Sequence, residues 1–310
     1  DVTADTVNII TKGMKDGNSL NNAIMLDAVA EGEQSTVTVN GNVNIAMTGG
    51  YGGNGIAVQK TDRLTDETIS IYDEEFYSYD NTIILREASY TADEAAIITI
   101  NGDVSIKGAD NQTWGIEANK ENVFSRFNNA GILTSVNKSQ VNINGNVDMD
   151  VYGNGVTVNA EDSSVTIAKG GQITVPKGTD YGYYTLAAYN GTINMNMGAD
   201  GQTVGSDDVV LNGDIFALKD GSINLALVTA DSELNGIVDN AGEANIYLQN
   251  GATWNNVQNN ERYALDYEDK GSGAFDKNGN YIGVSHVTNL HGGNSYDNSG
   301  VINQSVNSNN

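Results

Sequence analysis

Paired carboxylates are the side chains of this sequence that could do acid–base chemistry on a polysaccharide. Such pairs occur at Asp207-Asp208, at Glu74-Glu75 and at Asp148/Asp150. Two carboxyl groups on either side of a glycosidic bond are what a glycosidase needs. The chain has 40 acidic residues, so pairs of this kind arise by chance. We interpret them as parts of a solvated acidic surface, and we keep a polysaccharide-processing β-helix enzyme (a lyase or glycosidase) as the alternative function.

Groups for nucleophilic catalysis are scarce. His286 and His291 are the only histidines, and their place in a Gly/Asn-rich stretch predicts that they face solvent. No Gly-x-Ser-x-Gly motif occurs. Cysteine is absent, which excludes thiol nucleophiles, disulfides and thiolate metal sites. We therefore predict that the chain is not an enzyme and that it has no catalytic residues, no metal site and no cofactor.

The segment Asp276-Lys277-Asn278-Gly279-Asn280 resembles half of a calcium-binding loop. It lacks the downstream Glu and the correctly placed Gly of an EF-hand. A Gly-containing hairpin turn is the simpler interpretation of these residues.

A tyrosine-rich, acidic segment is the predicted binding surface. It combines large aromatic area with carboxylates that would attract a basic protein partner. The alternative is that its rings cover an open end or edge of the fold. The predicted ligand-binding residues are Tyr72, Asp73, Glu74, Glu75, Phe76, Tyr77, Tyr79 and Tyr90.

The charge of the chain limits its partners. The formal net charge is −25, so nucleic acids and anionic membrane surfaces would be repelled. No run of about 20 apolar residues is present, so we expect no membrane insertion by this segment. The expected partner is a host or bacterial surface protein or glycan, and a second copy of the chain is a further candidate.

A strand–turn–strand pattern recurs along the sequence. Each copy has two short β-branched segments on either side of an Asn-Gly-Asn/Asp turn, with apolar and polar residues in alternation. The copies are Val37–Ile45, Ile98–Ile106, Val141–Met149 and Val209–Ile215. A second pattern follows at Gly191–Met195, Gly221–Leu225 and Ala244–Leu248.

These repeats predict the fold. Alternation indicates strands with one buried face. Asn-Gly between strands also fits hairpins, so an antiparallel sandwich is the competing fold. Near-identical copies are better explained by stacking in register, with Val on Ile on Val inside and Asn on Asn in the turns. We predict an all-β fold, a right-handed parallel β-helix formed by one unit over 1–310, with loop or hairpin insertions at about 61–94, 121–138 and 256–283.

The last quarter of the chain resembles the passenger domains of type V autotransporters, in the pertactin-like and self-associating adhesin group. The resemblance rests on Leu234-Asn235-Gly236-Ile237, on Ile246 to Asn255 with its Ala-Thr-Trp, and on Ser285-His286-Val287-Thr288-Asn289-Leu290-His291-Gly292-Gly293. The stretch between Trp254 and Ser285 is longer than in that family.

The resemblance implies a function and a location. Such passengers are parallel β-helices that are secreted to the bacterial cell surface, where a C-terminal outer-membrane barrel, absent from this chain, anchors them. Most mediate adhesion to host cells or other bacteria, self-association or biofilm formation. We therefore expect an adhesin, and the resemblance does not identify its ligand.

Overall fold

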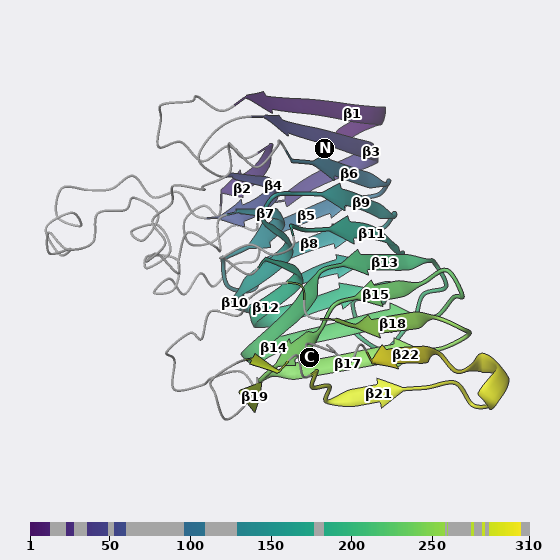
Figure 1. The fold of residues 1–310 in the computed structure, drawn as a ribbon. Coiled ribbons are helices and arrows are strands. Elements are labelled where there is room, and N and C mark those ends of the chain that lie inside the picture. Colours follow the sequence, from purple (N-terminus) through teal and green to yellow (C-terminus); the bar gives the residue numbers. More distant parts are fainter. Residues whose placement is uncertain are drawn as a thin grey trace, which may run out of the picture.

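The protein is described by a computed structural model, which covers residues 1–12, 23–27, 36–48, 53–59, 96–108, 129–176, 183–257, 259, 274–275, 281–282 and 285–304. Within these residues nearly all regular structure is β-strand, and one sheet contains 20 strands. Its strands pair in parallel with strands of the preceding and following turns of the chain (Figure 1). The predicted all-β parallel β-helix is confirmed.

Three parallel ladders form the sides of the helix. Face 1 consists of the first halves of β1 (Val2–Lys12) and β3 (Thr36–Thr48), β5 (Ile97–Ile100), β8 (Gln140–Ile143), the second halves of β10 (Asn154–Ile167), β12 (Tyr184–Met195) and β14 (Asp214–Leu227), β17 (Glu243–Leu248) and β21 (Asn289–His291). Face 2 consists of the second halves of β1 and β3, then β6 (Val104–Lys107), β9 (Val147–Asp150), β11 (Gly171–Thr174), β13 (Val209–Asn212), β15 (Glu233–Asn235), β18 (Thr253–Asn256) and β22 (Val301–Gln304). Face 3 consists of β2 (Ile24–Asp27), β4 (Gly53–Gln59), β7 (Asn129–Thr134), the first halves of β10, β12 and β14, and β16 (Val238–Asn240).

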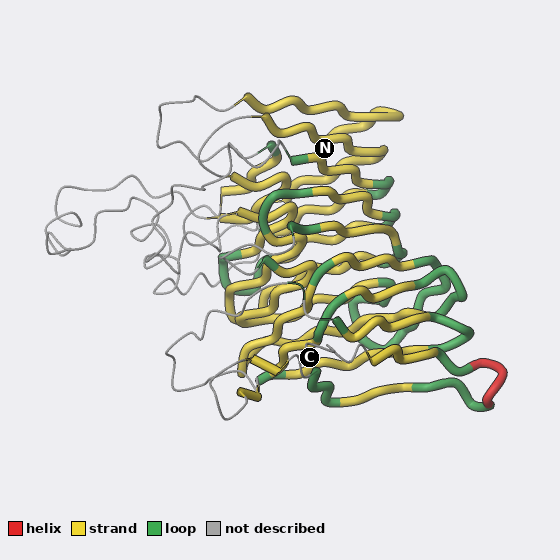
Figure 2. The backbone as a smooth tube through the Cα atoms, viewed as in Figure 1, coloured by secondary structure: helices red, strands yellow, loops and turns green. Residues whose placement is uncertain are grey.

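The strands of face 2 define nine successive levels among the described residues. Strand β1 lies at one end of the stack, and β21 and β22 lie at the other (Figures 1 and 2). With a strand spacing of about 4.8 Å, the stack is about 40 Å long.

The core is a set of apolar columns that run along the axis. Val37, Ile98 and Val141 occupy one register column on successive levels of face 1. Ile98 and Val141 are fully buried, and the residues between such positions point outward. Burying a side chain of this size contributes about 1.5–3 kcal/mol, so the alternation in sequence fixes which side of each strand faces the axis.

The Asn-Gly turns join face 1 to face 2 and are not hairpins. Asn101 donates from Nδ2 to Oδ1 of Asn40 over 2.6 Å, and Asn144 donates to Asn101 over 2.7 Å. A Cβ on Gly102 would collide with the carbonyl oxygen of Gly41 on the adjacent level. Close stacking therefore explains both residues of the motif, and the predicted stacking of Asn on Asn is confirmed.

The fourth copy of the repeat lies at a different corner from the first three. Asn212-Gly213 joins face 2 to face 3, where Asn235-Gly236 occupies the next level. A Cβ on Gly236 would collide with the carbonyl oxygen of Gly213. The sequence interpretation was wrong on this point because the same corner chemistry serves two corners of the helix.

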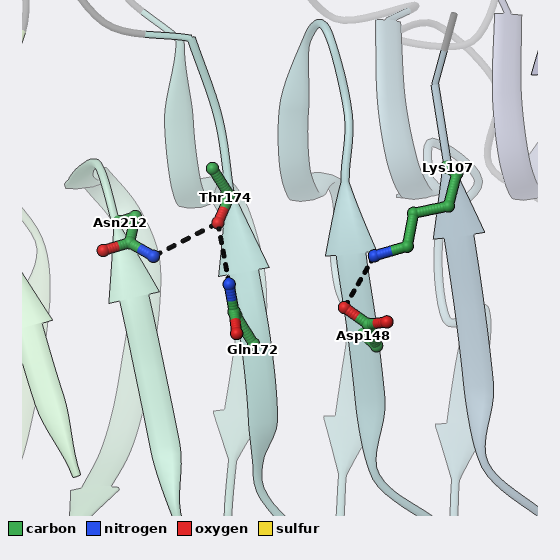
Figure 3. Close-up of polar contacts among 5 residues, drawn as sticks. All are labelled: Lys107, Asp148, Gln172, Thr174 and Asn212. Carbon is green, nitrogen blue, oxygen red and sulfur yellow. Dashed lines mark hydrogen bonds and ion pairs between the residues drawn. The ribbon is translucent and has the colours of Figure 1, made fainter. Parts of the chain in front are cut away.

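Side chains on the outside of face 2 bond across levels. Lys107 reaches over to Asp148 on the adjacent strand, with Nζ 2.7 Å from Oδ1 (Figure 3). Thr174 accepts bonds from Gln172 on its own strand and from Asn212 on the next level (Figure 3). Asp148, one of the carboxylates singled out in the sequence, is thus engaged in a surface ion pair.

The expected insertions have different outcomes. The interval 61–94 lies outside the described residues. Within 121–138, residues 129–134 form β7, which pairs with β4 and β10, so this part of the expected insertion is a strand of the helix. The interval 256–283 contains the separate antiparallel pair of β19 (Ala274–Phe275) and β20 (Tyr281–Ile282).

Candidate functional site

The tyrosine-rich residues predicted to bind a partner (Tyr72 to Tyr79 and Tyr90) lie outside the described residues, and their role stays a prediction. Among the other residues singled out, Asp207 bonds to Asn196 through its backbone. Asp208 accepts a 2.6 Å bond from Oγ1 of Thr229. Both residues of the Asp207-Asp208 pair thus take part in hydrogen bonds that hold loops of the protein.

A polar groove of about 460 Å³ lies on the outside of face 1, over its last four levels. Its volume is in the range of small-molecule binding sites. Strands β12, β14, β17 and β21 supply its floor, and the loop after β12 supplies its wall. The lining residues are Thr192, Asn194, Ala199, Asp200, Gly201, Gln202, Ser222, Asn224, Glu243, Asn245, Tyr247, Asn289 and His291.

An asparagine ladder runs along the floor of the groove. Asn224 donates from Nδ2 to Oδ1 of Asn194 over 2.8 Å, Asn245 donates to Asn224 over 2.9 Å, and Asn289 donates to Asn245 over 2.8 Å. Asn194 in turn donates to Oγ1 of Thr166 over 3.2 Å. The ladder fixes the rotamers of four amides, because each is held by the level above or below it.

The ladder changes from buried to accessible along the axis. Asn194 and Asn224 are 2% and 8% exposed, whereas Asn245 is half-buried and Asn289 is exposed. Gly201 of the wall lies over the buried amides, since a Cβ built on it would be 2.8 Å from Nδ2 of Asn224. The amides of the ladder that a ligand can reach are therefore those of Asn245 on β17 and Asn289 on β21.

The wall is held in shape by Asp200. Its carboxylate accepts bonds from the backbone N–H groups of Gln202 and Thr203 and from Oγ1 of Thr203, at 2.7–2.9 Å. The side-chain and backbone bonds from Thr203, followed by the Gln202 backbone, lower the pKa of Asp200 to about 2. This carboxylate stays ionised at neutral pH and organises its own loop.

The base of the wall is anchored to the helix. Asn196 donates from Nδ2 to the carbonyl oxygens of Asp207 and Ala226. A small apolar cluster of Met197, Ala226 and Val228 lies beneath it, with Tyr247 packed against the cluster. The same tyrosine thus links the wall to the floor.

An aromatic pair closes the accessible end of the groove. The rings of Tyr247 and His291, on adjacent levels, are stacked with centroids 4.3 Å apart and an interplanar angle of 14°. His291 is exposed, as its sequence context predicts, but it is part of the groove. His286 is half-buried, and its Nδ1 has no hydrogen-bond partner.

The groove is acidic. Asp200 and Glu243 are the charged residues among the described residues of its lining, and these include no lysine or arginine. Within the part of the chain that the structure describes, no group of three or more His, Cys, Asp or Glu residues is arranged to hold a metal ion. The described residues also contain no helix with the length and apolar character to cross a membrane.

The sequence predictions missed this groove. Asn224, Asn245 and Asn289 were each visible as polar residues of strands, but their alignment depends on a register that joins segments 21 and 44 residues apart. One signal could have found the aromatic pair: Asn245-x-Tyr247 and Asn289-x-His291 have the same spacing. Comparisons with models of protein families, with curated proteins and with solved structures find no match to this chain.

Proposed function

We propose that this chain is a binding module of a bacterial cell-surface adhesin, which holds its partner on the outside of a β-helical stem. The observation that carries the proposal is the groove on face 1. Its floor and wall are fixed by hydrogen bonds within the protein, so little side-chain freedom would be lost on binding. A preorganised polar surface of this kind suits recognition.

The chemistry of the groove favours binding over turnover. A glycosidase needs a carboxylic acid that keeps its proton near neutral pH, which requires a raised pKa. Bonds from Thr203 and Gln202 lower the pKa of Asp200 to about 2. Asp200 is therefore poorly suited to act as a general acid, and its partner carboxylate in the groove, Glu243, would have to act without it.

The resemblance of residues 234–255 and 285–293 to autotransporter passengers supports secretion to the bacterial surface. The absence of cysteine fits this route, because no disulfide could form and block export of the unfolded chain. On this proposal the partner is a surface protein or glycan of a host cell or another bacterium, or a second copy of the chain.

Coated beads test the proposed function directly. Beads carrying the purified chain should adhere to cultured epithelial cells, to bacteria that lack the chain or to one another, more than albumin-coated beads do. The same preparation should release no reducing ends from pectin, xylan or cellulose. Failure to adhere to every surface would contradict the proposal, and release of reducing ends would favour the polysaccharide-processing alternative.

A further inference from the structure

The accessible amides of the groove have hydrogen-bonding capacity left over. A primary amide has two N–H donors and two acceptor lone pairs. Asn245 donates one bond to Asn224 and accepts one from Asn289, which leaves one donor and one acceptor. A sugar hydroxyl both donates and accepts, so it matches the pair of functions that each such amide presents.

The polar groups repeat along the axis at the spacing of the levels. Thr192, Ser222 and Glu243 form one outward column beside the asparagine ladder. Four levels at about 4.8 Å span about 14 Å, which is the length of about three linked pyranose rings. Because Asn194 and Asn224 are buried, a chain of sugars along the axis would meet the hydroxyl groups of Thr192 and Ser222 on the first two levels and accessible amides on the last two.

The charge of the groove selects among sugars. Asp200 and Glu243 supply negative charge, and no lysine or arginine is present among the lining residues that the structure describes. Uronic acids, sialic acids and sulfated sugars would meet like charge both here and from the chain as a whole, whose net charge is −25. An uncharged sugar avoids this repulsion, and its hydroxyl groups can donate to the carboxylate of Glu243.

A peptide fits this groove poorly. Strands β12, β14 and β17 are paired on both sides, so among the described floor strands only the outer edge of β21, at the end of the stack, could pair with an added strand. Peptide and protein partners also depend on apolar anchors that enter pockets. Ala199 and Tyr247 are the apolar residues of the lining, and Tyr247 is already covered on one side by His291.

The aromatic pair supplies the remaining feature of a sugar site. His291 is exposed and lies flat on Tyr247, which itself packs against the cluster beneath the wall. The imidazole ring is therefore held in a fixed orientation. It offers a flat surface to the C–H groups of a pyranose ring beside Asn289, whose amide is exposed and donates one of its two N–H groups to Asn245.

We propose that the groove binds an uncharged oligosaccharide of about three pyranose residues, lying along the axis of the helix. The proposal rests on the binding function proposed above. Asn245, Asn289 and Glu243 hydrogen-bond the hydroxyl groups, and His291 on Tyr247 packs against a ring at the accessible end.

Isothermal titration of the full chain tests the proposal with defined probes. The neutral probes are cellotriose, mannotriose and tri-N-acetylchitotriose, the anionic probes are trigalacturonate and a heparin hexasaccharide, and the peptide probe is pentalysine. We expect at least one neutral trisaccharide to bind, and the anionic probes and pentalysine to bind at least tenfold more weakly. The trisaccharide should also bind more tightly than its disaccharide.

The control variant comes from a second asparagine ladder, on face 2, in which Asn235 donates to Asn212, Asn255 donates to Asn235 and Asn303 donates to Asn255. Asn289→Ala and His291→Ala should each weaken binding of the neutral trisaccharide about tenfold, and His291→Phe should restore most of it. Asn303→Ala is the matched control, because Asn303 ends the face 2 ladder with the same 2.8 Å bond, to Asn255. This control should bind as the unchanged chain does.

Three results would overturn the assignment of the groove to an uncharged oligosaccharide. The first is that no neutral trisaccharide binds, and the second is that an anionic probe or pentalysine binds more tightly than the neutral trisaccharides do. The third is that Asn289→Ala and His291→Ala leave the affinity for the neutral trisaccharide unchanged. Adhesion of coated beads that is unaffected by these two variants would leave the adhesin function standing and place the partner elsewhere. If beads that carry the unchanged chain fail to adhere to any surface, the adhesin function itself is contradicted.

Discussion

Individual glycines matter in this molecule because neighbouring levels approach at the corners. Gly102 has the carbonyl oxygen of Gly41 where its Cβ would be, and Gly145 has that of Gly102. At this corner the backbone of one level lies against the backbone of the next. A Cβ at Gly102 would therefore meet backbone atoms, which cannot move aside by changing a side-chain rotamer. The recurrence of Asn-Gly is thus a packing requirement more than a matter of turn conformation.

Replacing Gly102 with Ala should therefore lower the free energy of unfolding by about 1–3 kcal/mol. The corner would have to open on two levels at once, which would also stretch the bonds between Asn40, Asn101 and Asn144. Urea denaturation followed by circular dichroism measures the change. Gly292→Ala is the control, since nothing lies within 4 Å of its added Cβ, and an equal loss of stability in both variants would contradict the explanation.

The ionisation of Asp200 is the second effect at this scale. Its pKa of about 2 lies below the ordinary 3.8, so its bonds favour the folded wall above pH 3.8, and this contribution is lost as the pH falls through 2. Removing the hydroxyl donor with Thr203→Val should raise the pKa towards 3.8. The carboxyl ¹³C chemical shift of Asp200 as a function of pH gives the midpoint.

Thr229→Val is the matched variant for this titration. Thr229 donates its hydroxyl hydrogen bond to Asp208, which does not line the groove, as Thr203 does to Asp200. The Asp200 midpoint should be the same in Thr229→Val as in the unchanged chain. A midpoint near 3.8 in the unchanged chain would show that the carboxylate does not hold the wall.

At the scale of strands, the fold was predictable because each level repeats the chemistry of the previous one. Val37, Ile98 and Val141 could be aligned by eye, and the pairing confirms that alignment. The third copy of the second pattern, Ala244–Leu248, shows where alignment from the sequence alone fails. Ala244 stacks on Ile223, so the alignment of Ala244 with Gly221 was wrong by two residues. A shift of two preserves the buried face, which is why alternation alone could not detect it.

The groove could not be predicted for a related reason. Its floor depends on the exact register between β14, β17 and β21, and its wall is a loop that belongs to no repeat. Asp200 carries a local signal, because an Asp followed by Gly, Gln and Thr can form an Asx-type turn. Nothing in the sequence indicates that this turn lies over Asn224.

The ladder of face 1 should contribute to the stability of these strands. Asn224→Ala removes a donor to Asn194 and an acceptor for Asn245, so two amides lose a bond in a site that is 8% exposed. We expect a loss of about 1–3 kcal/mol in the free energy of unfolding, measured in urea. Asn303→Ala, at the exposed end of the other ladder, should change stability by less than about 0.5 kcal/mol. Equal effects in the two variants would mean that the ladder adds nothing beyond surface contacts.

At the scale of the whole molecule, the described part of the stack ends in apolar residues that are only partly covered. Leu290 and Ile302 stack on the core residues Ile246 and Trp254, yet each is 44% exposed. Trp254 itself is buried and donates from Nε1 to the carbonyl oxygen of Gly236, as expected for a tryptophan that fills the core. At the opposite end Val2, which stacks on the buried Val39, is 46% exposed, so among the described residues the core is partly exposed at both ends of the stack.

The net charge of the chain should make its thermal stability depend on salt. Acidic residues outnumber basic ones by 40 to 15, which gives a net charge of −25 on 310 residues. Among the residues whose burial the structure describes, every acidic side chain other than those of Asp214 and Asp239 is at least partly exposed. Mutual repulsion at that density opposes the compact state. Sodium chloride should raise the melting temperature, steeply up to about 0.1–0.3 M, where the screening length falls below ~10 Å, and only slightly beyond. Scanning calorimetry at constant pH measures the curve. Screening saturates in this range, whereas general salting-out continues to grow with concentration, so a rise that stays linear to 1 M, or no rise at all, would contradict the electrostatic explanation.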